Sequence, residues 1–265
     1  MRHKIGDGMR KRDTDSMIWH IDSTSMPDER NELETAYLDS IIRLGARKTG
    51  KRYNTVLDVP CGMGRLHGGL RRCGYDVYGL DINRGFIAEA KKAHPECADR
   101  YLLGDMRSFN IGMRFDVVVS WFTSFGYFKA DDDKRALGAI SSHMNRGALV
   151  ILDLVNEQWY KANMTDGYLG ISKNGDFVEI EDTKAPGMVG GRPQTIHSSR
   201  LYKRRGRDLA FVRDFKVPIR QYTVSGITKM LDAAGIRLAY AFERMNYKRP
   251  TPASSRNFVI AGIKR

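Results

Sequence analysis

The sequence lacks the features that mark a membrane protein or a secreted protein. Its 265 residues contain no apolar run of about 18 or more, so we expect no membrane-spanning helix. Residues 1–12 have no apolar stretch of the kind found in secretion signals. Cysteine is scarce, and Cys61, Cys73 and Cys97 form no C-x-x-C pair. These absences predict a reduced, cytoplasmic protein.

Two nucleotide-binding signatures are also missing. The chain has no G-x-x-x-x-G-K-[ST] loop, which argues against a P-loop nucleotide triphosphatase. The dinucleotide fingerprint G-x-G-x-x-G is incomplete, because His67 stands where the third glycine should follow Gly62 and Gly64. A dehydrogenase is therefore a distant alternative. The histidines show neither H-x-x-x-H spacing nor a cluster with cysteines, so we predict no metal site.

Positive charge is present but unevenly distributed. The net charge is +13, and residues 186–265 contain 17 Lys and Arg against 4 Asp and Glu, while the rest of the chain is neutral. Such an excess attracts nucleic acid, acidic lipid or an anionic substrate. It is equally compatible with an ordinary solvated surface, because no basic run is longer than residues 203–205.

Strand and helix patterns alternate up to residue 154. Apolar runs predict strands at 54–60, 75–81, 99–104, 114–120 and 147–154. Helical spacing predicts helices at 64–73, 83–93 and 131–145, and a first helix from Asp28 to Leu44 with Leu33, Tyr37, Ile41 and Leu44 on its apolar face. This alternation is typical of an α/β fold with a doubly wound parallel sheet, whose ligand crevice lies at the carboxyl ends of the strands.

The alternation stops at residue 156. Strand-like segments at 177–182, 195–203 and 209–218, separated by turns with Gly and Pro, predict a small antiparallel β insertion. A helix after residue 222 and strands near 236–244 and 256–264 end the chain. We therefore divide the chain into an N-terminal segment with a lid helix (1–44), a core (45–155), the insertion (156–221), and a C-terminal helix with a closing strand pair (222–265).

The segment 55–64, Thr-Val-Leu-Asp-Val-Pro-Cys-Gly-Met-Gly, is the most informative in the chain. An apolar strand that carries Asp58 ends in a loop with Gly62 and Gly64, and a helix follows. Glycine has no Cβ, so a ligand can approach the backbone of such a loop closely. The free N–H groups at the start of the helix suit a carboxylate or a phosphate.

Acidic residues also end the next two strands. Asp81 can accept hydrogen bonds from both hydroxyls of a ribose, or it can cap the helix that begins near Asn83. Asp105 follows Gly104 at the end of the third strand. Three acids at the ends of three consecutive strands indicate a nucleoside site more strongly than any one of them. A dehydrogenase would explain Asp81 but has no need of Asp105.

The run Leu-Asp-Val-Pro-Cys-Gly-Met-Gly-Arg resembles the first motif of class I S-adenosylmethionine (SAM) dependent methyltransferases, although Pro60 replaces the usual glycine. The resemblance covers roughly residues 30–155 and 220–265. It implies a seven-stranded Rossmann-like sheet whose core binds SAM. The insertion resembles the β lid of sugar N-methyltransferases and glycine N-methyltransferase-like enzymes, which implies that residues 156–221 roof the substrate pocket.

The resemblance also implies roles for single residues. Asp58 and its loop would hold the methionine part of SAM, Asp81 the ribose, and Asp105 the adenine amino group. The implied cofactor-binding residues are Asp58, Pro60, Cys61, Gly62, Gly64, Arg65, Asp81, Ile82, Gly104, Asp105, Met106 and Trp121.

The aromatic segment 120–128, Ser-Trp-Phe-Thr-Ser-Phe-Gly-Tyr-Phe, would lie over the methyl group. It has no Asn-Pro-Pro-Tyr or Asp-Pro-Pro-Tyr and instead resembles the loop of small-molecule N- and O-methyltransferases. Since aromatic faces attract cations, Trp121, Phe122 or Tyr127 is expected to face the sulfonium. We expect Phe122 and Phe128 to belong to the core. The catalytic candidates are Tyr127 and, as a base, His197 of the insertion.

We predict methyl transfer from SAM to a nitrogen or oxygen of a small-molecule acceptor, by direct in-line displacement. The acceptor would be anionic if the basic region lines the pocket, and the lack of an obvious base favours an amine. One alternative is an RNA or protein methyltransferase with a continuous basic face formed by Arg192, Arg200, Lys203, Arg204, Arg205, Arg207, Arg213 and Arg220. Another is a non-catalytic protein that kept the fold. The sequence is compatible with a homodimer.

Overall fold

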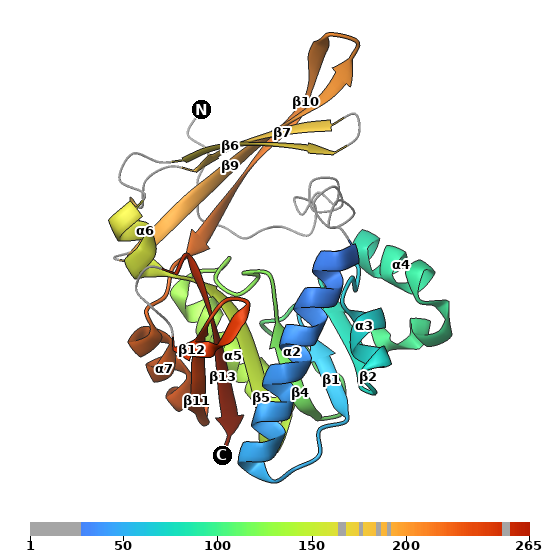
Figure 1. Ribbon diagram of the computed structural model, residues 1–265, viewed down its shortest axis with the longest axis vertical. Coiled ribbons are helices and arrows are strands. Elements are labelled where there is room, and N and C mark those ends of the chain that lie inside the picture. Colours follow the sequence, from blue (N-terminus) through green and yellow to red (C-terminus); the bar gives the residue numbers. More distant parts are fainter. Residues whose placement is uncertain (1–27, 164–167, 175–176, 184–186, 190–191, 251–254) are drawn as a thin grey trace.

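The described part of the chain forms two β-sheets, with helices packed on the larger one (Figure 1). The computed structural model describes residues 28–163, 168–174, 177–183, 187–189, 192–250 and 255–265. No helix among these residues is both long enough and apolar enough to cross a membrane.

The larger sheet has eight strands in the order β12-β11-β13-β5-β4-β1-β2-β3. Its parallel strands are β1 (Thr55–Asp58), β2 (Asp76–Asp81), β3 (Tyr101–Leu103), β4 (Phe115–Ser120) and β5 (Met144–Val155). Its antiparallel strands are β11 (Ile236–Glu243), β12 (Asn246–Pro250) and β13 (Asn257–Lys264). The predicted seven-stranded doubly wound sheet is confirmed, with β12 added at its edge. Strand order reverses between β1 and β4, where such sheets bind their ligands.

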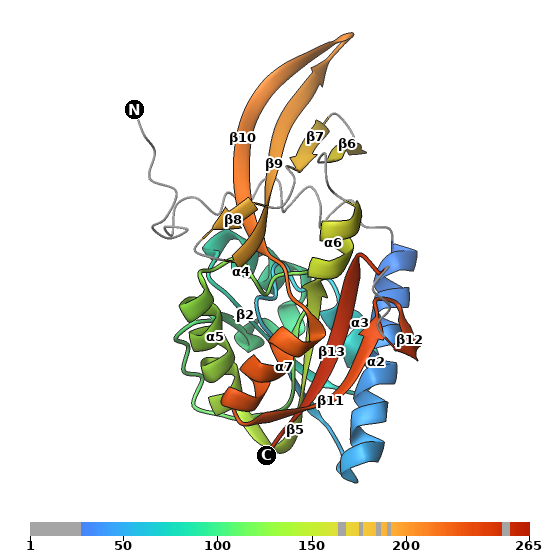
Figure 2. The same cartoon turned by 90° about the vertical axis from the view of Figure 1, so that its left-hand side faces the viewer.

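Helices cover both faces of the large sheet (Figure 2). They are α2 (Asp28–Thr49), α3 (His67–Arg72), α4 (Arg84–Ala93), the 3-10 helix η1 (Pro95–Arg100), α5 (Ala130–Ser142) and α7 (Val224–Ala233). On one face, α2 and α3 pack against a cluster that includes Val119, and on the other α5 and α7 pack against a cluster that includes Val118. Successive side chains of a strand point to opposite faces, which explains why the central strands read as continuous apolar runs.

The helix after the glycine loop begins later than predicted. Gly62 and Gly64 have φ angles of 55° and 71°, so the chain turns twice before α3 starts at His67. The sequence pattern could not locate this start, because glycine adopts left-handed and right-handed conformations with similar ease.

The first helix differs from its prediction in length and in its buried face. α2 continues to Thr49, and Leu33, which was expected on the apolar face, is 63% exposed. Tyr37 and Ile41 are buried as predicted, and the buried face also includes Leu38, Ile42 and Gly45, with the side chain of Leu149 against Gly45. Contact with β5 therefore decides which side of the helix is buried.

The predicted antiparallel insertion forms the second sheet, with strand order β10-β9-β7-β6 and β8 paired with β9. Its elements are α6 (Glu157–Asn163), β6 (Tyr168–Asn174), β7 (Phe177–Thr183), β8 (Gly187–Val189), β9 (Arg192–Arg205) and β10 (Asp208–Arg220). The sequence pattern did not indicate α6, β6 or β8. The sheet lies beyond the carboxyl ends of the parallel strands (Figure 1). The division at residues 44, 155 and 221 stays a prediction.

Close packing behind the glycine loop leads to a first prediction. A Cβ on Gly79 of β2 would lie 2.7 Å from Sγ of Cys61 and 2.8 Å from Cε1 of His67. We expect Gly79→Ala to lower the free energy of unfolding by about 1–3 kcal/mol. The control Gly138→Ala, where a Cβ meets nothing within 4 Å inside α5, should raise it by about 0.5–1 kcal/mol. Urea denaturation measures both, and equal stabilities would contradict the prediction.

Candidate functional site

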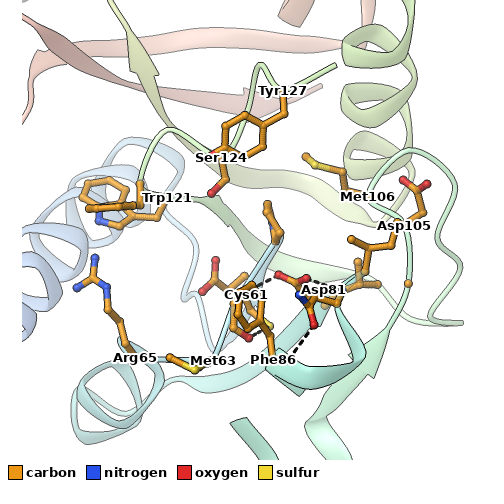
Figure 3. A pocket seen from close by; sticks show the side chains of 18 of the residues that line it. Cys61, Met63, Arg65, Asp81, Phe86, Asp105, Met106, Trp121, Ser124 and Tyr127 are labelled. Carbon is orange, nitrogen blue, oxygen red and sulfur yellow. Dashed lines mark hydrogen bonds between the residues drawn. The ribbon is translucent and has the colours of Figure 1, made fainter. Parts of the chain in front are cut away.

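A pocket opens at the carboxyl ends of β1, β2 and β4 (Figure 3). Arg65 and Trp121 lie at one end of it, and Asp105 and Met106 lie at the other. The predicted site residues that line it are Asp58, Pro60, Cys61, Gly62, Arg65, Asp81, Ile82, Gly104, Asp105, Met106, Trp121 and Tyr127. The structure therefore brings together residues from four separate loops.

Two predicted site residues do not line the pocket. Gly64 lies behind it, where a Cβ would come within 2.8 Å of the hydroxyl of Tyr101, so Gly64 serves the turn and the packing beneath the loop. His197 lies in β9 opposite Val217 of β10, and its side chain is outside the described part of the chain. The structure does not test a role for His197 as a base.

The pocket is also lined by residues that were not among the predicted cofactor-binding or catalytic residues. They are Met63, Leu66, Leu80, Asn83, Phe86, Arg107, Phe122, Ser124 and Phe128. Phe122 and Phe128 were expected in the core, but both are half-buried and border both the pocket and the core. Asn83 and Arg107 stand two residues after Asp81 and Asp105, a spacing that could have indicated them.

The backbone of the glycine loop has open space on its pocket side. A Cβ on Gly62 would meet no atom within 4 Å, and Gly62 has a positive φ that disfavours other residues. Its N–H donates a hydrogen bond to Oδ2 of Asp81 at 2.9 Å. The carboxylate at the end of β2 therefore holds the loop that follows β1.

Asp81 is buried and its carboxylate accepts two backbone hydrogen bonds. Oδ2 accepts from Gly62, and Oδ1 accepts from the N–H of Asn83 at 2.8 Å. Burial raises the pKa of Asp81 to about 6, although these hydrogen bonds oppose the rise. The cap of α4 is Asn83, whose side chain accepts from the N–H groups of Gly85 and Phe86, and not Asp81. Each oxygen of Asp81 keeps a lone pair for a further donor.

Asp58, at the end of β1, has one bonded oxygen and one free oxygen. Oδ2 lies 3.1 Å from Nε2 of the buried His67, whose ring stacks on Tyr101 at 5.2 Å. Oδ1 is buried and has no partner among the described residues. A buried carboxylate oxygen without a donor is costly, so Asp58 suits a cationic or hydrogen-bonding ligand in the pocket.

Asp105 is paired with Arg107 at the far end of the pocket. Nη2 of Arg107 lies 2.6 Å from Oδ2 of Asp105, and Nη1 lies 3.3 Å from Oδ2 of Asp132 in α5. Burial alone would raise the pKa of Asp105, but the hydrogen bonds and charge of Arg107 lower it below its usual value. The Arg107 guanidinium also lies over the ring of Phe128, 4.6 Å from its centre. Asp105 therefore stays ionised beside the pocket.

At the end of the pocket near Arg65 and Trp121, charged side chains form a network around two buried carboxylates, those of Glu34 and Asp153. Glu34 of α2 accepts a hydrogen bond from the indole N–H of Trp121 at 2.9 Å and forms ion pairs with Arg65 and Arg244. Burial would raise the pKa of Glu34, but the two guanidinium groups and the indole lower it. Arg244 also lies 3.2 Å from the fully buried Asp153 of β5. The network fixes Arg65 and Trp121 at the pocket wall.

Comparisons with known proteins agree with this geometry. Residues 56–147 match the family model described as "Methyltransferase domain". The chain is 31% identical over 118 residues to a dTDP-3-amino-3,4,6-trideoxy-alpha-D-glucopyranose N,N-dimethyltransferase of Streptomyces venezuelae, which covers 44% of this chain and 47% of that protein. The matched part of the chain spans about half the length of the curated relatives.

Solved structures resemble the whole chain. An S-adenosylmethionine-dependent methyltransferase from Clostridium acetobutylicum superposes with a TM-score of 0.74 at 15% identity, covering 94% of this chain and 97% of that one. A sugar N-methyltransferase from Streptoalloteichus has a TM-score of 0.71 at 15% identity, covering 100% and 97%. The fold is that of the class I SAM-dependent methyltransferases, as the sequence predicted.

The charge network gives a second prediction. Glu34→Ala leaves the half-buried guanidinium groups of Arg65 and Arg244 without their shared carboxylate and the indole N–H of Trp121 without its acceptor, so we expect a loss of about 3 kcal/mol in the free energy of unfolding. Glu32→Ala, on the exposed side of the same helix, should change it by less than about 0.5 kcal/mol. Chemical denaturation followed by circular dichroism measures both. Similar small losses in the two variants would show that the network adds nothing.

Proposed function

We propose that the protein is a SAM-dependent methyltransferase that methylates a nitrogen of a small-molecule acceptor. The observation that carries the proposal is the pairing of Asp81 with Gly62, in which a buried carboxylate meets an open glycine loop where the strand order reverses. The curated relatives methylate amino sugars attached to dTDP, and this supports an amine in a sugar as the acceptor.

The residues of the pocket fit SAM by their chemistry. The free oxygen of Asp58 suits the ammonium group, and the two oxygens of Asp81 suit the ribose hydroxyls. Asp105 and Met106 stand where the adenine would lie, and Arg65 stands at the opposite end, beside the space for the methionine carboxylate. Bound SAM would supply an activated methyl group, so the protein contributes mainly position and exclusion of water.

The acceptor would enter on the side of the aromatic loop. Ser124 and Tyr127 line the pocket there, opposite Asp81 and Cys61 (Figure 3), and Phe128 also lines the pocket. We assign Tyr127 the role of positioning the acceptor nitrogen before the methyl group. No histidine lines the described pocket. A neutral amine can attack the methyl group without a base, whereas a hydroxyl needs one. The composition of the described pocket therefore favours a nitrogen acceptor over an oxygen acceptor. His197 remains a candidate base in the insertion.

The small-molecule acceptor is preferred to RNA. The predicted basic face included Arg220, but its side chain is 4% exposed and lies 2.7 Å from Asp133. Arg200, Lys203, Arg204, Arg205 and Arg207 are exposed on or beside β9, while the side chains of Arg192 and Arg213 lie outside the described residues. A concave pocket lined by apolar side chains and a few polar groups is typical of small-molecule sites.

Transfer of tritiated methyl groups from SAM to nucleotide-linked amino sugars tests the function. We expect incorporation with an amino sugar and none with the matching hydroxy sugar or with RNA. Gly62→Ala should raise the dissociation constant for SAM at least tenfold, because its Cβ would fill the open cradle. Gly50→Ala is the matched control, since Gly50 also has a positive φ and open surroundings but lies outside the pocket. SAM binding without transfer to any acceptor would favour a non-catalytic protein.

Binding of SAM should depend on pH through Asp81. Its pKa of about 6 means that only about one tenth of the protein has an ionised Asp81 at pH 5, and a protonated carboxyl accepts fewer hydrogen bonds. We expect the dissociation constant to be about tenfold higher at pH 5 than at pH 7. Calorimetry at both values measures the change, and in Asp81→Asn the affinity should be lower and its pH dependence weaker. An equal pH dependence in both proteins would contradict the assignment.

A further inference from the structure

The strand β10 enters the core at a buried ion pair. Arg220, its last residue, is 4% exposed, and its Nε donates to Oδ2 of Asp133 in α5 at 2.7 Å. Asp133 is fully buried, and Oδ2 also accepts from the hydroxyl of Tyr222 at 2.8 Å. Because buried charges are costly without partners, these side chains hold β10 in a fixed place on α5.

The same arginine holds the aromatic loop on both sides of Tyr127. The backbone N–H of Arg220 donates to the carbonyl of Gly126 at 2.9 Å, and Nη2 donates to the carbonyl of Phe128 at 3.1 Å. A Cβ on Gly126 would lie 3.1 Å from the carbonyl oxygen of Arg220, so the aromatic loop and the end of β10 are in close contact. One residue of the insertion therefore determines where the loop passes the pocket.

Apolar packing continues the same connection. Tyr127 packs against a small cluster formed by Val155, Tyr160 and Ile219, in which Ile219 belongs to β10. The ring of Tyr222 lies 5.7 Å from that of Phe125 in the loop. The insertion therefore contacts the loop through the apolar side chains of Tyr160 and Ile219 as well as through the hydrogen bonds of Arg220.

We call the group formed by Arg220, Asp133 and Tyr222 the clasp. The first turn of α5 connects the clasp to the end of the pocket near Asp105. Asp132, next to Asp133, holds Arg107 at 3.3 Å, and Arg107 lies over the ring of Phe128. Two adjacent acids of one helix therefore bind the two arginines, Arg220 and Arg107, that contact the segment carrying Tyr127 and Phe128. The position of the loop relative to Asp105 follows from the position of α5.

We propose that Arg220 is a positioning residue that couples the insertion sheet to the acceptor side of the pocket. It acts through the carbonyls of Gly126 and Phe128, which set where Tyr127 and Phe128 stand against the acceptor. This inference rests on the proposed methyltransferase function. It assigns Arg220 no contact with SAM, because Arg220 does not line the pocket.

Steady-state kinetics of Arg220→Met and Arg220→Lys test the coupling. For Arg220→Met we expect the KM of the acceptor to rise at least tenfold, while the dissociation constant for SAM changes less than twofold. Arg220→Lys keeps a positive charge for Asp133, but a single ammonium group cannot bind Asp133 and the carbonyl of Phe128 as the guanidinium does. Its KM for the acceptor should therefore lie between those of the wild-type protein and Arg220→Met. Arg200→Met, at an exposed arginine of the same sheet, is the control. An unchanged acceptor KM, or an equal loss of SAM affinity, would overturn the proposal.

Hydrogen–deuterium exchange gives a second test that needs no enzymatic activity. We expect Arg220→Met to speed exchange of the amides of residues 122–128 and leave α2 unchanged, and Arg200→Met to alter neither. If the methionine variant does not fold, Arg220→Lys and Tyr222→Phe carry the experiment, since each keeps part of the clasp. A wild-type protein that transfers no methyl group would refute the proposed function, whereas unchanged exchange would refute the clasp.

Discussion

A buried carboxylate at the end of β2 is the constraint on which the pocket depends. Asp81 must be satisfied by hydrogen bonds, and one of its donors is the backbone of Gly62 from the neighbouring strand end. That bond fixes the glycine loop in a conformation with positive φ and leaves its pocket side open. The conformation of the glycine loop and the negative charge beside it therefore both depend on the buried carboxylate of Asp81. The raised pKa of Asp81 follows from the same burial.

Charge compensation governs the walls in a similar way. Glu34, Arg65, Arg244 and Asp153 form one network, and Asp133 and Arg220 form a separate buried pair. In both, the partners come from segments far apart in the sequence. Removing one member leaves an uncompensated charge in the interior, which costs more than the pair contributes. Glu34 accepts a hydrogen bond from the indole of Trp121, and Arg220 holds the backbone on both sides of Tyr127.

Much of the fold was predictable because the apolar runs in the sequence coincide with the strands that are buried on both faces of the sheet. The central strands were found as apolar runs, Asp58 and Asp81 were found because each ends a strand, and Asp105 because it follows the third strand by two residues. Contacts across the chain were not predictable. The loop residue Phe122 has a φ of 59°, which no propensity indicates, and it lies among three arginines from three different segments. Arg220 looked like surface charge, since its partner Asp133 belongs to a distant helix.

The order of the strands has a consequence for synthesis on the ribosome. β13, near the end of the chain, lies between β5 and β11, and Arg244 and Arg220 follow long after the acids that they neutralise. A nascent chain that has reached only β5 lacks one neighbour of that strand and the counter-charges for Asp133 and Asp153. The parallel half of the sheet therefore cannot complete its interior until residues 220–264 have also been synthesised.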